Sequence, residues 1–126
     1  MRLLLDTHTF LWWYKDDKKL GRKARSLIVD AVDVSVSVAS AWEFSIKKAL
    51  GKLDLVNDFE MAVEETGFSK LMIGFEHARV IATMMPYNND PFDRMLVAQA
   101  MVENVTLVTA DKKLSAYPVR ILNAEK

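Results

Sequence analysis

The sequence predicts an α/β fold in which a parallel sheet is covered by helices on both faces. Short apolar or β-branched runs alternate with longer segments whose apolar residues recur at helical spacing. This alternation is typical of parallel strands joined by crossover helices. No internal repeat, low-complexity tract or long linker interrupts it. With 126 residues, 51% of them hydrophobic, the chain is long enough for a single domain, residues 1–126, with its own core.

The N-terminal third is predicted to contain two strands and two helices. Leu3–Leu5 is a short apolar run bounded by Asp6, which predicts a buried strand, and Thr7–Tyr14 continues with a very apolar helical pattern. A second helix is expected over residues 21–31. Val34–Val38 alternates valine with serine and therefore predicts the second strand.

The middle of the chain is predicted to be mainly helical. Ser40 is expected to begin a helix with its apolar residues on one side, and Gly51 is expected to cap the end of that helix. Further helices are predicted over 56–65 and 75–85, the second of them ended by the proline that follows it. Residues 70–73 are expected to form a short strand between these two helices.

The C-terminal third is predicted to contain a clearly marked helix and two strands. Asp90–Pro91 places an aspartate at the N-cap and a proline at the first helical position, and this helix is expected to end near Asn104. Val105–Thr109 is rich in β-branched residues and predicts a buried strand. A turn or single helical turn over Asp111–Ala116 and a last strand over Val119–Leu122 complete the chain.

Composition and charge narrow the classes of function. Lysine and arginine together number 17, as do aspartate and glutamate, so the net charge is zero and no overall positive field attracts nucleic acid. If the chain binds RNA, a local basic patch, a partner subunit or bound metal ions must provide the attraction. The absence of cysteine excludes disulfides, thiolate zinc sites and cysteine nucleophiles. With no signal-peptide pattern and no run of about 18 apolar residues, we expect a cytoplasmic protein without a membrane span.

Four carboxylates are candidates for a functional site, although each also has a structural explanation. Asp6 and Asp111 both follow a predicted strand and can cap the helical turn after it. Ser40 and Glu43 match a capping box, in which the glutamate closes back on the start of its helix. Asp93 stands at the third position of its helix, where a negative charge suits the helix dipole.

The position of these acids relative to the sheet favours a shared function. Asp6 and Asp111 lie at the C-terminal ends of strands, and Glu43 begins the helix after another strand. In an open parallel sheet these ends lie along one edge, where ligands bind. Asp93 follows no predicted strand, but it opens a helix, and helix starts gather toward the same edge.

Carboxylates that converge need a counter-charge. Two unit charges about 4 Å apart repel by about 4 kcal/mol at an effective dielectric constant near 20, so such a cluster binds a cation or keeps an acid protonated. Oxygen ligands favour Mg²⁺ or Mn²⁺. With no cysteine and only two histidines, a zinc site is disfavoured. A metal ion at an open edge, with a metal-activated water as nucleophile, suits hydrolysis of a phosphodiester bond.

Several sequence motifs occur in order along nearly the whole chain. They are LLDTH at 4–8, WW at 12–13, AWEFSIK at 41–47, GKL at 51–53, DPFDRMLVAQA at 90–100 and LVTAD at 107–111. Together they resemble a PIN domain, and in particular the VapC-type toxins of prokaryotic toxin–antitoxin pairs. The block at 90–100, combined with the Trp-Glu helix, is the most specific part of this resemblance.

The resemblance implies a fold, an activity and partners. PIN domains resemble one another in being three-layer α/β/α sandwiches with a central, mainly parallel sheet of about five strands. The VapC-type toxins that this chain resembles are Mg²⁺- or Mn²⁺-dependent endoribonucleases and usually homodimers. For this chain the resemblance therefore implies an RNA substrate, a second copy, and a cognate antitoxin that inhibits it. Contact with operator DNA is expected only through the antitoxin complex.

The resemblance also assigns site residues. The family's acidic site, both catalytic and metal-binding, corresponds to Asp6, Glu43, Asp93 and Asp111. Thr109 corresponds to the polar residue that supports the last acid, and Thr7 is expected in a similar supporting role. No acid of the family's set is missing, so an active enzyme is expected.

Two basic residues near the acids have roles that the sequence leaves open. Lys47 lies four residues after Glu43 on the same helix face, so it forms an ion pair or else balances the acid cluster or meets a phosphate. Arg94 either contacts the substrate or forms a surface salt bridge. His8 is disfavoured as a general base, because a metal-bound water makes one unnecessary, and His77 is expected to be structural.

The five consecutive apolar side chains of Phe10–Tyr14 cannot all lie on one side of a helix. Some of these side chains are therefore expected to form a contact surface for a second copy or for an antitoxin.

Two other classes of function compete with the nuclease. A receiver-type signalling domain is disfavoured, because that fold needs paired acids after its first strand and Asp6 is not preceded by an acid. A catalytically idle PIN-fold module that acts through antitoxin and RNA binding stays open.

Overall fold

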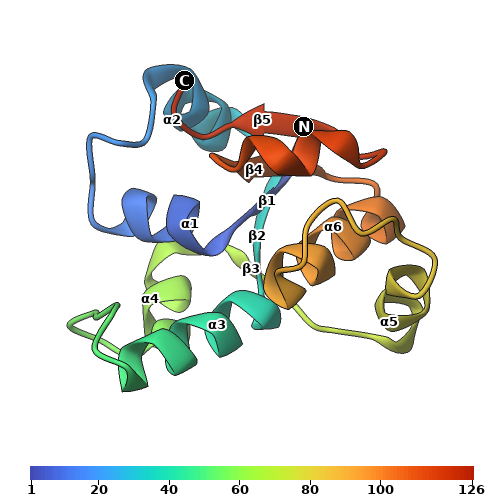
Figure 1. The fold of residues 1–126 in the computed structure, drawn as a ribbon. Helices are drawn as coiled ribbons and strands as arrows, with labels where there is room; N and C mark the ends of the chain where they lie inside the picture. Colours follow the sequence, from blue (N-terminus) through green and yellow to red (C-terminus); the bar gives the residue numbers. More distant parts are fainter.

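A five-stranded parallel sheet forms the centre of the computed structural model, which describes residues 1–126 (Figure 1). The strands lie in the order β3-β2-β1-β4-β5, and every neighbouring pair is parallel. Their bounds are β1 Arg2–Leu5, β2 Asp33–Ser37, β3 Ser69–Leu71, β4 Thr106–Thr109 and β5 Ile121–Asn123. All five predicted strands are present, with small shifts at their ends.

Helices cover both faces of this sheet, so the predicted three-layer α/β/α sandwich is confirmed. Their bounds are α1 Thr7–Tyr14, α2 Arg22–Asp30, α3 Val38–Ala49, α4 Phe59–Thr66, α5 Phe75–Ile81, α6 Pro91–Glu103 and the 3-10 helix η1 Lys112–Ala116. None of these helices has the length and apolar character needed to cross a membrane.

Alternate residues of the central strand β1 belong to different cores. Leu3 and Leu5 pack in a cluster with side chains of α1, α2 and α4 on one face of the sheet. Leu4 packs in a second cluster with side chains of α6 and η1 on the opposite face. All three leucines are fully buried. Because neither face of the sheet is left in water, the strand is apolar throughout, which explains the unbroken leucine run.

The strand register aligns the C-terminal ends of three neighbouring strands. Leu5 of β1 pairs with Val36 of β2 on one side and with Val108 of β4 on the other. The chain therefore leaves all three strands at the same edge of the sheet. The segments that begin there are α1, α3 and the turn that leads into η1.

Helix α3 begins earlier than predicted. Its N-cap is Ser37, because β2 runs into the helix without a loop, and the Ser37 hydroxyl accepts a hydrogen bond from the Ala39 N–H at 2.9 Å. The Ser40 hydroxyl is buried without a hydrogen-bond partner. The predicted capping box of Ser40 and Glu43 is therefore wrong, and the Glu43 carboxylate is left for other contacts.

The C-terminal end of α3 lies where it was predicted. Gly51 has a φ of 72°, in the left-handed region that favours glycine. The N–H groups of Gly51 and Lys52 donate to the carbonyls of Lys48 and Lys47 at 2.9 and 2.8 Å. These two bonds form a Schellman motif, which satisfies carbonyl groups that the helix end leaves free.

Helices α4 and α5 are shorter than predicted. Helix α4 begins at Phe59, because Asp58 is its N-cap and accepts a backbone hydrogen bond at 2.8 Å. Helix α5 ends at Ile81, well before Pro86, which was predicted to end it. The Ile81 carbonyl accepts hydrogen bonds from the Met84 N–H at 3.2 Å and from Arg94 at 3.4 Å.

The two serines of α3 test the corrected N-cap. We expect Ser37→Ala to lower the free energy of unfolding by about 1 kcal/mol, because the Ala39 N–H loses its acceptor. Ser40→Ala removes a buried hydroxyl without a partner, so it should leave this free energy unchanged or raise it. Urea unfolding followed by circular dichroism measures both changes. A larger loss for Ser40→Ala than for Ser37→Ala would show that the N-cap is misassigned.

Candidate active site

An acidic pocket of about 350 Å³ opens at the edge of the sheet where β1 and β4 end and α3 begins. Five carboxylates line it, from Asp6, Glu43, Asp90, Asp93 and Asp111. Its other lining residues include Thr7, His8, Trp12 and Lys47. The structure therefore brings together the four predicted acids and adds Asp90, for which the sequence predicted a capping role.

Asp6 connects β1 to α1 and is 9% exposed. Its Oδ1 atom accepts the Thr9 N–H at 2.8 Å, so Asp6 caps α1 as well as lining the pocket. Burial raises the pKa of Asp6, and hydrogen bonds from Thr109 and Thr9 counteract part of this rise. The cap uses one carboxyl oxygen to fix the orientation of the side chain.

Glu43 lies in the second turn of α3 and is buried, with both carboxylate oxygens bonded. The Thr7 hydroxyl donates to Oε1 at 2.6 Å, and Lys47 Nζ donates to Oε2 at 2.8 Å. The ion pair expected from the spacing of Glu43 and Lys47 is therefore present. Thr7 orients the carboxylate, and Lys47 balances its charge from within the pocket.

The start of α6 carries two of the acids. Asp90 is the N-cap, as predicted, and its Oδ1 atom accepts the N–H groups of Phe92 and Asp93 at 2.8 and 3.1 Å. Pro91 occupies the first helical position, where its missing N–H costs nothing. The cap therefore fixes the first turn of α6 and, with it, the position of Asp93.

Asp111 is the N-cap of η1. Its Oδ1 atom accepts the Lys113 N–H at 3.0 Å, and its own N–H donates to Thr109 Oγ1 at 3.0 Å. Thr109 is buried and does not line the pocket. Thr109 also hydrogen-bonds to Asp6, so this buried residue contacts both Asp6 and Asp111.

Asn88 connects two of the acids and was not identified from the sequence. Its Nδ2 atom lies 3.3 Å from Oδ2 of Asp93 and 3.3 Å from Oδ2 of Asp111. Its Oδ1 atom accepts the Asp90 N–H at 2.7 Å, and its own N–H donates to the Tyr117 hydroxyl at 3.2 Å. The only indication in the sequence is its place in a polar loop just before a helix cap.

Arg94 does not line the pocket. Its guanidinium group donates to the carbonyls of Ile81, Met85 and Asn88 and to the Tyr117 hydroxyl. Of the two predicted roles, the surface salt bridge is absent, and a direct contact with substrate has no support from this placement. Because its hydrogen bonds are taken up by the loop before α6, Arg94 holds the segment that carries Asn88.

The two histidines have different surroundings. His8 is exposed and lines the acidic pocket. His77 is buried outside it, where Nδ1 accepts the Gly74 N–H at 3.0 Å and Nε2 lies 3.0 Å from a Glu103 oxygen. These contacts hold the start of α5 against α6, which is the structural role expected for His77.

Charge repulsion in the pocket acts most strongly on Asp93. Its pKa is raised to about 7, first by burial and then by repulsion from Asp90, Asp6, Glu43 and Asp111. The five acids therefore lie within electrostatic range of one another. Lys47, the one lysine or arginine that lines the pocket, does not cancel this excess of negative charge.

The donor set of the pocket suits a divalent cation. Carboxylate oxygens are the ligands that Mg²⁺ and Mn²⁺ prefer, and the pKa of Asp93 is raised by burial and then by repulsion from the other four acids. No three acidic or histidine side chains are arranged to hold an ion as they lie. Both oxygens of Glu43 are already bonded, so its use as a ligand requires release from Lys47 or Thr7. The residues fit such an ion by their chemistry, with adjustment of side chains.

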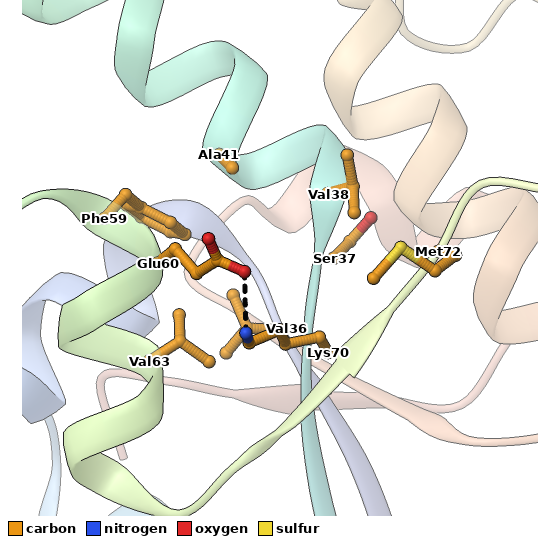
Figure 2. Close-up of a pocket in the computed structure, with 9 residues that line it drawn as sticks. All are labelled: Val36, Ser37, Val38, Ala41, Phe59, Glu60, Val63, Lys70 and Met72. Atoms are coloured by element: carbon orange, nitrogen blue, oxygen red, sulfur yellow. Dashed lines mark hydrogen bonds and ion pairs between the residues drawn. The ribbon is translucent and has the colours of Figure 1, made fainter.

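A second pocket, of about 230 Å³, lies between α3, α4 and β3 (Figure 2). Its lining is mostly apolar, with Phe59, Val63 and Met72 among its walls. Lys70 crosses its edge and pairs with Glu60 at 2.7 Å, as the dashed line in Figure 2 marks. This pocket contains no cluster of acids and no nucleophile–base pair, so the acidic pocket is the candidate active site.

An exposed apolar stripe follows α3. Its members recur every four residues: Val38, Trp42, Ile46 and Leu50 are 38%, 55%, 42% and 64% exposed. Trp42 also packs edge-to-face on Phe92 of α6, with ring centroids 4.9 Å apart. The run Phe10–Tyr14, where a contact surface was predicted, is buried or half-buried. The larger apolar exposure is therefore on α3, and this α3 stripe was not predicted from the sequence.

Several solved structures have a similar fold. VapBC2 from Rickettsia felis, bound to a DNA fragment from its promoter, has a TM-score of 0.70, 15% identity and coverage of 98% of both chains. FitAcB from Neisseria gonorrhoeae has a TM-score of 0.68, 19% identity and 97% coverage of both chains. DNA-bound VapBC from Salmonella typhimurium has a TM-score of 0.67, 18% identity and 97% coverage of both chains. At these identities the likeness concerns the fold.

Comparison of sequences identifies the family. The chain is 25% identical over 122 residues to Ribonuclease VapC22 of Mycobacterium tuberculosis, and the match covers 91% of each protein. A family model described as the PIN domain matches residues 3–119, a range that includes all five acids of the pocket. The chain therefore belongs to the PIN-domain family and is a homologue of Ribonuclease VapC22.

Proposed function

We propose that this chain is a metal-dependent endoribonuclease that acts as the toxin of a toxin–antitoxin pair in the cytoplasm. The observation that carries the proposal is the convergence of five carboxylates on one pocket, with the pKa of Asp93 raised to about 7. A PIN-domain relative named as a ribonuclease supports the choice of RNA as substrate.

Asp6, Asp93 and Asp111 are the proposed metal ligands. Glu43 is a proposed fourth ligand, whose carboxylate must first break its hydrogen bond with Lys47 or Thr7. The ion we propose is Mg²⁺ or Mn²⁺. When bound, it lowers the pKa of water and neutralises charge that develops on the phosphoryl oxygens during hydrolysis. No side-chain nucleophile is required, which agrees with the absence of cysteine from the chain.

The protein's own contribution is to hold the carboxylates before any ligand arrives. The N-caps of α1 and η1 each fix an acid by one oxygen, at Asp6 and Asp111. Asn88 holds Asp93 and Asp111 together through one amide group. Because these contacts come from helix starts on a rigid sheet, they limit the reorganisation that binding requires.

We also propose contacts with a cognate antitoxin and with a second copy of the chain. One solved structure of similar fold, from Klebsiella pneumoniae, is described as a toxin–antitoxin complex, and VapBC2 and VapBC are described as bound to DNA. Contact of this chain with operator DNA would then run through the antitoxin. The α3 stripe supports a protein–protein contact, since exposed apolar surface in a row marks such sites.

A catalytically idle PIN-fold module is the alternative. It would keep the pocket and the partner surfaces and bind RNA without hydrolysing it. Hydrolysis by the purified chain separates the two functions.

Two acids of the pocket test the catalytic proposal. We expect Asp6→Asn and Asp93→Asn each to reduce Mn²⁺-dependent cleavage of RNA by more than about 100-fold, because each removes a charged oxygen ligand. Asp58→Asn is the control, since Asp58 caps α4 away from the pocket and should leave cleavage unchanged. Gel analysis of RNA with Mn²⁺, Mg²⁺ or EDTA measures these rates. Equal cleavage by wild type and both pocket variants would point to a contaminating nuclease and refute the site.

Burial and repulsion from the other acids raise the pKa of Asp93, so the stability of the metal-free protein, measured in EDTA, should depend on pH. The pKa of Asp93 is higher in the folded chain than in the unfolded chain, so unfolding releases a proton and stability falls as pH rises from about 4 to about 7. Asp93→Asn removes this effect, so the variant should have a higher Tm than wild type at pH 8. The difference in Tm should shrink at pH 5. A variant less stable than wild type at pH 8 would contradict the repulsion.

The α3 stripe predicts the oligomeric state. We expect wild type to be a dimer and Leu50→Lys to shift it to monomer, because a lysine in the contact would bury a charge. Val56→Lys is the control, because Val56 is an exposed apolar residue that lies outside the stripe. Light scattering after size exclusion measures the mass. A Leu50→Lys dimer that no longer binds antitoxin would assign the stripe to the antitoxin instead.

A further inference from the structure

Trp12 is the only phenylalanine, tyrosine or tryptophan that lines the acidic pocket, and its indole is a larger apolar ring than the imidazole of His8, which also lines it. Only one other lining residue, Ala110, is apolar, and the rest are polar or charged. The indole is half-buried, because it packs against the core cluster that α1 shares with the sheet. Its backbone is also fixed, since the Trp12 carbonyl accepts the Asp17 N–H at 2.8 Å. Trp12 is therefore a rigid apolar surface in the wall of a charged pocket.

The contacts of the three tryptophans differ. Trp13 lies beside Phe68, with ring centroids 5.7 Å apart, and Arg25 sits 5.9 Å above its ring. Trp42 packs against Phe92. Trp12 has no aromatic or cationic partner, and its indole N–H makes no hydrogen bond within the chain. Packing against the core explains one side of Trp12 but not its place among five carboxylates, because an indole offers no metal ligand.

The pocket as a whole is unfavourable for a phosphate backbone. Five carboxylates line it, and its single lysine, Lys47, is already paired with Glu43. The chain has no net positive charge to compensate. Because the pocket itself offers no free basic residue, stacking of a base on an aromatic ring would add an uncharged contact with the substrate beside the reacting phosphate.

Given the nuclease function proposed above, we propose that Trp12 stacks on a nucleobase next to the scissile phosphate and thereby selects unpaired RNA. A base inside a duplex has both faces covered by its neighbours, so it cannot reach the indole. Every base has a π face, so stacking on Trp12 favours single strands and loops without fixing the sequence. Trp12 is a positioning and specificity residue rather than part of the acid chemistry.

Two substitutions at one position separate stacking from packing. Both Trp12→Phe and Trp12→Leu keep an apolar side chain against the core, but only phenylalanine keeps an aromatic face. The substrate is a single-stranded RNA oligonucleotide, compared with the same oligonucleotide carrying an abasic nucleotide on either side of the cleaved bond. Fluorescence anisotropy with the same labelled oligonucleotides measures binding in parallel with KM and kcat.

We expect Trp12→Leu to raise KM for the intact oligonucleotide by about 10- to 100-fold with little change in kcat, and Trp12→Phe to stay close to wild type. One abasic substitution should raise the KM of the wild type to the value of Trp12→Leu on the intact oligonucleotide. The same substitution should not raise the KM of Trp12→Leu further. Stacking would be overturned if Trp12→Leu raised KM by the same factor on the intact and the abasic oligonucleotides, or if it lowered only kcat. Unchanged RNA kinetics with a loss of antitoxin affinity would make Trp12 a protein contact and also overturn it.

The binding measurement keeps this inference distinct from the nuclease proposal. The wild type could bind RNA without cleaving it. Stacking would then still be supported, although the nuclease proposal had failed, if the abasic substitution weakened binding by the wild type but not binding by Trp12→Leu. If the wild type neither binds nor cleaves single-stranded RNA, both proposals are wrong.

Discussion

The parallel pairing of β1 with both of its neighbours determines where three of the five acids of the pocket lie. Leu5 pairs with Val36 and Val108, so three strands end together, and the next residues of the chain enter helices at that edge. Asp6 and Asp111 reach the pocket directly from strand ends, and Glu43 reaches it from α3. A slip of one residue in this register would turn Leu4 toward the opposite core and move Asp6 away from the edge.

The same carboxylates serve both the fold and the pocket. Asp6, Asp90 and Asp111 each accept a backbone N–H at the start of a helix and also line the pocket. Capping and ligand binding are therefore compatible uses of one side chain, since a carboxylate has two oxygens. Capping stabilises the ionised form, while burial opposes it at Asp6 and both burial and repulsion between the acids oppose it at Asp93. A protein with such a cluster gives up stability for a site that attracts cations.

The sequence predicted the features that depend on local pattern. All five strands follow from apolar or alternating runs, and the Asp90–Pro91 start of α6 follows from cap chemistry. The placement of Asp93 came from family resemblance, because no strand precedes it. The role of Asn88 could not be predicted, since the path of its loop depends on hydrogen bonds with Arg94 and with the sequence-distant Tyr117. The cap at Ser37 was missed because the pattern cannot show that β2 enters α3 without a loop.

Neutral overall charge and an acidic pocket together constrain how a nucleic acid could be held. In proteins that bind nucleic acids through many basic contacts, affinity falls steeply with salt because counterions are released. This chain pairs Lys47 with Glu43, and no other lysine or arginine lines the pocket. Attraction must then come from a cation held by the acids, from aromatic stacking, from lysines and arginines outside the pocket or from neighbouring subunits. In the nuclease proposed above, a bound cation would therefore be required before the acidic pocket could receive a phosphate.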